Sequence, residues 1–374
     1  MRGMRVLSIL AGLAGLANAG AAHAIAWYFQ TPASGIARDI DQLHQYIMWL
    51  IIVIFIGVFG FMFWSVYAHR KSKGHQAEQF HENTTVEILW TVIPAIILVI
   101  IAWPVTKTVI AQKDTSAPDL TIKVTGYQWK WGYDYIKGEG EGISFLSTLA
   151  TPRDQIEGNA PKGENYLLEV DNEVVVPVGK KVRVIVTAAD VIHAWWIPAF
   201  GAKQDAIPGF LRDIWFRAEE TGTFRGQCTE LCGKEHAFMP IVVRVVSPED
   251  YSKWVGERKK VMSASAEDAS KTWSVDELLA RGEKVYAANC VACHQGTGRG
   301  VPPAFPPLAG SKVVNGPEEG QIDTVLNGRP GTAMAAFGKQ LSDTDIAAVI
   351  TFTRKSWGNK ASEVQPAEVK ERRK

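Results

Sequence analysis

Two long apolar stretches dominate the first third of the chain. Residues 46–67 contain no charged side chain, and a second apolar stretch runs from about residue 88 to residue 105. At roughly 1.5 Å of helical rise per residue, such stretches cross a hydrocarbon layer of about 30 Å. The pattern predicts a hairpin of two transmembrane helices within residues 25–110, with Pro94 as a kink in the second helix.

The charges around this hairpin indicate its orientation. The short loop between the two spans contains Arg70, Lys71 and Lys73, and such a cluster is typical of the cytoplasmic side. Residues 1–24 have the arginines, apolar core and small-residue site of a cleavable secretory signal peptide, although an uncleaved anchor is the alternative. The sequence therefore predicts a two-pass protein of a bacterial inner membrane, with everything after the second span on the periplasmic side.

From residue 111 to residue 250 the chain changes to short β-type runs separated by Gly and Pro. Examples are residues 120–125, 166–170, 181–187 and 241–246. Strands of this length and spacing predict an antiparallel sandwich or barrel. A polar, Gly-rich insertion at residues 138–163 is expected to loop out of it.

The pattern after residue 250 is helical. A short helix predicted to end near Val261 and a small-residue linker make up residues 251–272. A serine–glutamate capping box then opens a helical domain over residues 273–357. Residues 358–374 are charged and poor in apolar side chains, and are predicted to be disordered.

The charge and the cysteines narrow the functional classes. A net charge of +1 over 374 residues gives no reason to expect a nucleic-acid partner. The four cysteines form two close pairs, Cys228 with Cys232 and Cys290 with Cys293. In an exported protein such pairs are disulfides by default. Here both pairs lie inside fuller ligand patterns.

One segment concentrates metal-binding side chains. It contains Cys228, Cys232, His236 and Met239, and His193 lies upstream at a predicted strand end. Thiolate, thioether and imidazole ligands together select copper. Two cysteines separated by three residues allow both sulfurs to bridge two metal ions, with one histidine for each ion. A four-ligand zinc site and a disulfide loop remain the alternatives.

A second segment has the attachment pattern of c-type haem. Cys290 and Cys293 are spaced to bind the haem vinyl groups, and the adjacent His294 would ligate the iron. Met334 is the one methionine after the linker, and it lies in a Gly- and Pro-rich loop. This position favours a second iron ligand over a core methionine, which is the alternative. Methionine–histidine ligation raises the reduction potential of a haem.

The copper segment resembles a known family. His193 followed by Cys-x-Glu-x-Cys-x3-His-x2-Met resembles the CuA signature of cytochrome c oxidase subunit II, and the resemblance covers about residues 27–250. It implies a cupredoxin-like Greek-key domain with a dinuclear copper centre (CuA). The implied ligands are His193, Cys228, Cys232, His236, Met239 and the main-chain carbonyl of Glu230. It also implies that the Glu230 side chain binds a magnesium ion shared with the catalytic subunit.

Two further matches imply roles for single residues. Residues 127–135 resemble the family's aromatic stretch, so Trp129 would receive electrons above the copper site, although Lys130 stands where the family usually has an aromatic residue. An amphipathic strand whose aromatic residues simply pack is the alternative. Residues 85–90 resemble the start of the family's second helix, so Glu87 would stand at the cytoplasmic mouth of a proton path. A solvated acid favoured by the helix dipole is the alternative there.

Residues 273–357 resemble a class-I cytochrome c. The resemblance implies that Gly282 allows the first and last helices of this domain to pack closely. It also implies that the carbonyl of Pro306 holds the second ring nitrogen of His294. The expected fold is thus a two-helix transmembrane hairpin, an all-β cupredoxin-like domain and an all-α cytochrome c domain.

The two modules together resemble the subunit II of cytochrome-c-fused haem–copper oxidases. Electrons would pass from a covalent haem c through CuA to the catalytic subunit I of a proton-pumping oxidase, which reduces oxygen to water. The implied partners are subunit I and further oxidase subunits, an upstream cytochrome or other donor, and membrane lipid. The alternatives are the relay subunit of a copper-containing nitric oxide reductase and a membrane-tethered electron carrier without a catalytic partner. A quinol oxidase subunit would lack the copper ligands.

Overall fold

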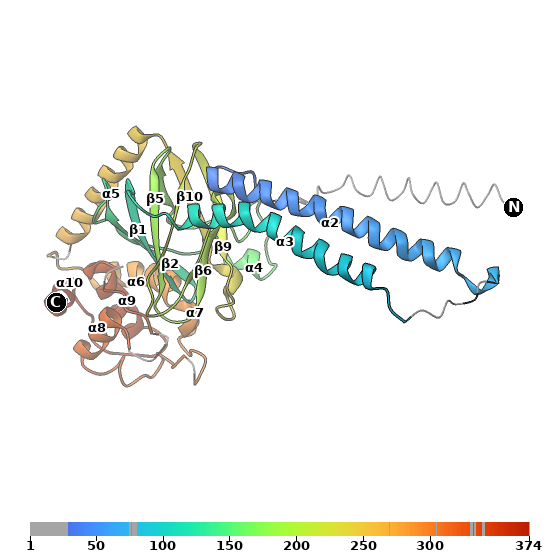
Figure 1. The fold of residues 1–374 in the computed structure, drawn as a ribbon. Coiled ribbons are helices and arrows are strands. Elements are labelled where there is room, and N and C mark those ends of the chain that lie inside the picture. The colour runs from blue at the N-terminus through green and yellow to red at the C-terminus, as the bar shows by residue number, and fades with distance from the viewer. Residues whose placement is uncertain are drawn as a thin grey trace. The chain divides into compact units, whose positions relative to one another are not determined.

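The structure is a computed structural model, and the protein's helices and strands are drawn in Figure 1. It describes residues 29–74, 76, 81–268, 270–303, 305–329, 332, 334–338 and 341–373. The signal peptide expected at residues 1–24 lies outside these residues. All the helices and strands named below belong to one compact unit, residues 32–374.

Two long helices carry the apolar stretches: α2 (Gly35–Ala68) and α3 (Thr84–Lys113). Both are long and apolar enough to cross a membrane. They extend beyond the apolar runs because capped polar turns are added at their ends. Ser34, for example, accepts a hydrogen bond from the main-chain N–H of Ala37 at the start of α2. Pro94 lies within α3.

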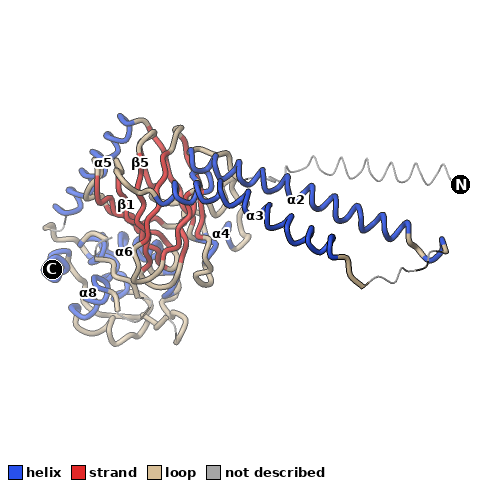
Figure 2. The backbone as a smooth tube through the Cα atoms, in the orientation of Figure 1, coloured by secondary structure: helices blue, strands red, loops and turns tan. Residues whose placement is uncertain are grey.

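Two five-stranded sheets form a sandwich, as Figure 2 shows in red. In spatial order, the first sheet contains β3 (Ser144–Ser147), β2 (Lys130–Lys137), β1 (Leu120–Tyr127), β5 (Lys181–Ala188) and β8 (Arg212–Arg217). The second contains β4 (Val174–Pro177), β10 (Pro240–Val246), β9 (Gly222–Cys228), β6 (His193–Ile197) and β7 (Ala202–Ala206). The pairs β1–β5 and β4–β10 are parallel and the other pairs are antiparallel.

The side chains that fill the interior of the sandwich alternate along each strand with side chains that point outward. Val182, Val184 and Val186 of β5 are at most 1% exposed, because every second side chain of a strand points to the same face. Trp131 and Trp195, one from each sheet, are also almost completely buried. The predicted sandwich is therefore confirmed, with two parallel pairings added to the antiparallel ones.

Two details of the sandwich were predicted wrongly. Residues 166–170 do not form a strand, and Val170 makes only a single bridge, to Leu149. The insertion at residues 138–163 does not simply loop out, since it contains β3 and the short helix α4 (Arg153–Ile156). Ile143 and Phe145 of this segment are buried in the core of the sandwich domain, which holds the otherwise polar segment in place.

The helix after the sandwich is longer than predicted. Helix α5 (Pro248–Asp268) continues past Val261, so much of the expected linker is helical. The next helix begins at Val275. Tyr251 and Val255 of α5 are buried in the core of the sandwich domain and fix the start of the helix there.

The C-terminal domain is all-helical. It contains α6 (Val275–Asn289), α7 (Val291–His294), α8 (Glu318–Asn327), α9 (Asp343–Lys355) and α10 (Pro366–Arg372). Short 3-10 turns elsewhere are η1 (Lys71–Lys73), η2 (Pro198–Phe200) and η3 (His236–Phe238). A Cβ added to Gly282 of α6 would lie 2.1 Å from the carbonyl oxygen of Ala348 in α9. The close packing predicted at Gly282 is thus confirmed.

The predicted disorder of residues 358–374 is wrong for the residues described there. Val364 and Val369 are completely buried in the core of the helical domain. The main-chain N–H of Val364 donates to Thr351 Oγ1 at 2.9 Å, and Gln365 caps α10. Burial of these two valines orders the segment despite its charged composition, because burial depends on the position of each side chain and not on the average hydropathy.

Candidate functional site

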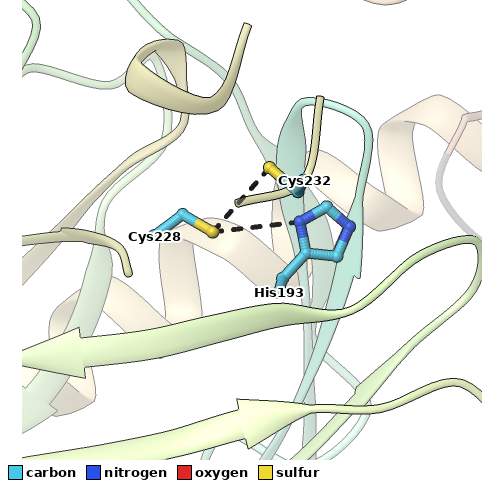
Figure 3. Close-up of side chains that lie close together, drawn as sticks. All are labelled: His193, Cys228 and Cys232. Atoms are coloured by element: carbon cyan, nitrogen blue, oxygen red, sulfur yellow. Dashed lines mark hydrogen bonds between the residues drawn. The ribbon is translucent and has the colours of Figure 1, made fainter. Parts of the chain in front are cut away.

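The sandwich brings two cysteines and two histidines together. Cys228 ends β9 and His193 begins the neighbouring strand β6, so the sheet itself sets their spacing. The Sγ of Cys228 lies 3.9 Å from the Sγ of Cys232 and 3.9 Å from the Nδ1 of His193, as Figure 3 shows. The Sγ of Cys232 lies 3.5 Å from the Nδ1 of His236. Each sulfur therefore has its own imidazole.

Two further donor atoms complete the set that the sequence predicted. The Sδ of Met239 lies 3.5 Å from the Sγ of Cys232, and the carbonyl oxygen of Glu230 lies 3.3 Å from the Sγ of Cys228. Both cysteines are free thiols and both are buried. Cys228, Cys232 and His193 place their ligand atoms within 4.8 Å of one another. Thiols, imidazoles and a thioether in one buried cluster fit copper, which soft ligands select.

The cluster also makes one thiol acidic. Hydrogen bonds with Cys232 and, to a smaller extent, with His193 together lower the pKa of the Cys228 thiol to about 4. The hydrogen bond with Cys228 in turn raises the pKa of the Cys232 thiol. Since a thiol must lose its proton to bind a metal, the cluster offers one ligand that is already ionised at neutral pH.

Asp190 links a predicted ligand to the turn that carries Trp129. Its Oδ1 lies 2.9 Å from the Nε2 of His193, and its Oδ2 accepts a hydrogen bond from the main-chain N–H of Gln128 at 2.7 Å. A carboxylate on Nε2 fixes the ring orientation and leaves Nδ1 for a metal. No motif marks Asp190 in the sequence. Its position three residues before a histidine is the only signal that could have identified it.

Trp129 lies in the turn between β1 and β2 and is 7% exposed. Its Nε1 donates to the carbonyl oxygen of Cys232 at 3.3 Å, and Gln128 Nε2 donates to the same oxygen at 2.8 Å. Gly233 has φ +123°, and a Cβ there would lie 2.9 Å from the indole. The copper-segment backbone can therefore approach the indole closely only with a glycine at this position.

The helical domain places three of the predicted haem-binding residues at or in α7. Cys290 follows α6, and Cys293 and His294 lie in α7. The Nδ1 of His294 lies 3.0 Å from the carbonyl oxygen of Pro306, which confirms the predicted contact. The two cysteines are free thiols, and Met334 is half-buried in the loop before α9. Paired thiols beside an imidazole with an oriented ring fit a covalently attached haem.

Three family profiles match successive parts of the chain. They are cytochrome c oxidase subunit II, transmembrane domain, over residues 22–107; the periplasmic domain of the same subunit, over residues 120–246; and cytochrome c oxidase, cbb3-type, subunit III, over residues 277–352. The cytochrome c oxidase subunit 2 of Cereibacter sphaeroides is 42% identical over 245 residues, which cover 62% of this chain and 80% of that protein. The chain belongs to the cytochrome c oxidase subunit II family.

Other members are similarly close. The cytochrome c oxidase subunit 2 of Cyanidium caldarium is 40% identical over 61% of this chain and 88% of that protein. The crystal structure of the periplasmic domain of subunit II of cytochrome oxidase from Bradyrhizobium japonicum is 52% identical, covers 38% of this chain and 95% of that domain, and has a TM-score of 0.34.

Membership of this family accounts for the membrane hairpin and the sandwich domain. As a subunit II, the chain is part of an oxidase complex and has two membrane-spanning helices and an extracytoplasmic cupredoxin-like domain. That domain implies CuA copper, and the C-terminal cytochrome domain implies haem c. This combination supports a role for the chain in electron input to the oxidase.

The remaining predicted residue lies on a different element. Glu87 is exposed in the first turn of α3, and its Oε1 accepts a hydrogen bond from the main-chain N–H of Asn83 at 3.3 Å. Asn83 in turn accepts from the N–H of Val86. In this structure the Glu87 carboxylate therefore caps the helix that crosses the membrane.

Proposed function

We propose that this subunit II is the electron-input subunit of a proton-pumping haem–copper cytochrome c oxidase. Electrons pass from its covalent haem c through its CuA centre to subunit I, where oxygen is reduced to water. The observation that carries the proposal is the pair of buried thiols, Cys228 and Cys232, 3.9 Å apart and each beside its own imidazole. When bound, a copper pair supplies a one-electron carrier whose charge is shared between two ions.

The chain's own residues hold this centre. The proposed ligands are His193, Cys228, Cys232, His236, Met239 and the carbonyl oxygen of Glu230. A zinc site would use the two cysteines and two histidines. It would leave the Met239 thioether, which is 1% exposed and 3.5 Å from Cys232, without a role. A dinuclear copper site uses all six donors.

The haem is held by the C-terminal domain. Cys290 and Cys293 would form the covalent attachment, and His294 and Met334 would bind the iron. The Pro306 carbonyl accepts from the His294 Nδ1–H, so the ring presents Nε2 to the iron. An upstream cytochrome or another donor supplies electrons to this domain.

Trp129, Glu87 and Glu230 complete the proposal. Trp129 conducts electrons to the copper centre, which its contact with the Cys232 carbonyl supports. Glu87 stands at the mouth of a proton path into subunit I, where its position at the start of α3 holds the carboxylate at the membrane boundary. The Glu230 side chain is exposed, and we propose that it binds magnesium together with subunit I.

Exposed apolar side chains next to proposed copper ligands are the proposed contacts with subunit I. Val191 and Ile192 directly precede His193, and Leu231 directly precedes Cys232; these three side chains are 37–79% exposed. Exposed apolar side chains that gather beside a functional site are typical of protein contacts. Further oxidase subunits and membrane lipid surround α2 and α3, and the protein lies in a bacterial inner membrane with both electron-carrying domains on the periplasmic side.

Metal analysis and electron paramagnetic resonance of the purified full-length chain test the proposal. We expect two copper ions for each haem c, and a spectrum in which one unpaired electron couples equally to two copper nuclei. The Cys228→Ser variant should keep its haem but lose this coupling. A single copper ion, or zinc in its place, would refute the copper assignment. Turnover of oxygen by the co-purified complex, but not of nitric oxide, distinguishes an oxidase from a nitric oxide reductase.

A further inference from the structure

Lys130 is a buried lysine that reaches from the sandwich domain to the helical domain. It begins β2, directly after Trp129, and is 6% exposed. Its Nζ donates to the carbonyl oxygen of Asn289 at 3.3 Å. Asn289 is the last residue of α6 and immediately precedes Cys290. The ammonium group therefore contacts the helix end at which the haem would be attached.

An aromatic ring provides the second contact of this lysine. The Nζ of Lys130 lies 4.3 Å from the centroid of the Phe337 ring, within the usual range of a cation–π interaction. Phe337 is 5% exposed and follows Met334 by three residues. Burial lowers the pKa of the Lys130 ammonium, because its charged form loses hydration. The ring and the carbonyl are contacts that offset this loss.

A second lysine, Lys234, makes similar contacts with aromatic rings, one of which is the Trp129 ring itself. The Nζ of Lys234 lies 5.8 Å from the Trp129 ring and 5.9 Å from the Phe305 ring. Phe305 precedes Pro306, whose carbonyl orients His294, and it packs against the core of the sandwich domain. The two lysines thus contact the two loops that hold or orient the proposed axial ligands.

We propose that Lys130, assisted by Lys234, docks the chain's own haem-bearing domain on the Trp129 surface and so makes the tethered haem the donor to copper. The inference rests on the proposed function. The two ammonium groups contact the rings of Phe337 and Phe305, so the contact with the helical domain does not require a carboxylate on that domain. A separate soluble cytochrome with a basic face would meet two like charges at this surface, which disfavours its docking.

The test uses the full-length chain within its purified oxidase, with Lys130→Met as the variant. Methionine is similarly long and unbranched but uncharged. We expect electron transfer from haem to copper, measured after flash photoreduction, to slow at least tenfold. We also expect faster proteolysis between α5 and α6, because an undocked domain exposes the connection, and measurable direct reduction of copper by added basic cytochrome c. Lys234→Met should produce the same changes to a smaller extent.

Lys137→Met is the matched control, since Lys137 lies at the other end of β2 and is exposed. It should behave as the wild type in all three measurements. Wild-type electron transfer and proteolysis in Lys130→Met would overturn the proposal. If Lys130→Met does not accumulate, Phe337→Leu removes the ring instead, and wild-type proteolysis in that variant would equally overturn it. Copper and haem contents are measured first, so that failure to form the copper pair is distinguished from failure of the helical domain to dock. Proteolysis reports docking even in a protein that lacks copper.

Discussion

The indole Nε1 of Trp129 donates a hydrogen bond to the main-chain carbonyl of Cys232, 3.3 Å away. The side-chain amide of Gln128 donates to the same carbonyl, so the turn between β1 and β2 is fastened directly to a proposed copper ligand. A path of covalent and hydrogen bonds therefore leads from the indole to the Cys232 sulfur without crossing a gap.

The first prediction concerns this path. Trp129→Phe keeps an aromatic ring but removes the N–H donor. We expect copper reduction by the haem to slow about tenfold, equivalent to roughly 1.4 kcal/mol in the barrier, with copper content unchanged. Trp215→Phe is the control, because Trp215 Nε1 donates to the Ala111 carbonyl, far along the sequence from any copper ligand. Equal rates in both variants would remove Trp129 from the path.

The second prediction concerns Asp190. Asp190→Ala removes the partner of His193 Nε2 and the acceptor of the Gln128 N–H. Loss of a carboxylate that orients a metal-bound histidine typically weakens metal binding by about 10–100-fold. Competition with a copper chelator measures this loss. Asp171→Ala is the control, since Asp171 also accepts two hydrogen bonds in the same domain, both from Thr148. Wild-type copper retention in Asp190→Ala would contradict the positioning role.

The third prediction concerns the contact between α6 and α9. A Cβ at Gly282 would lie 2.1 Å from the Ala348 carbonyl oxygen and 2.7 Å from the Cβ of Phe352. Gly282→Ala should destabilise the helical domain by about 1–3 kcal/mol, as overpacking does. Gly320→Ala in α8 meets no atom within 4 Å and should be neutral or stabilise by up to about 1 kcal/mol. Thermal unfolding followed by haem absorbance compares the two, and equal melting temperatures would refute the tight contact.

The sequence was most informative where chemistry and spacing coincide. Cys228, Cys232 and His236 are close in sequence, so a single loop brings their side chains together. His193 is distant in sequence and is placed beside them by strand β6. The contact between His294 and Pro306 was likewise anticipated from the resemblance to class-I cytochromes. Residues so close in sequence can be predicted to lie close together without knowledge of the whole fold.

The sequence was least informative where long-range packing decides. Asp190 has no motif, and its role depends on a turn 62 residues away that presents the Gln128 N–H. The last helix was missed because the segment is charged on average, although Val364 and Val369 are buried in the core of the helical domain. The burial of Lys130 depends on the Phe337 ring of another domain, which no local pattern could show.

The fourth prediction separates the two interpretations of Met334. As an iron ligand it raises the haem reduction potential, since thioether ligation favours the ferrous state. Met334→Ala should then keep the covalent haem but lower its potential, and the ferrous haem should bind carbon monoxide at the open axial position. A core methionine would instead cost about 2–5 kcal/mol of stability when truncated, without a change in potential. Met262→Ala is the control, because Met262 is 40% exposed on α5 and should change neither property. A wild-type potential together with no carbon monoxide binding in Met334→Ala would assign the second axial position to another residue.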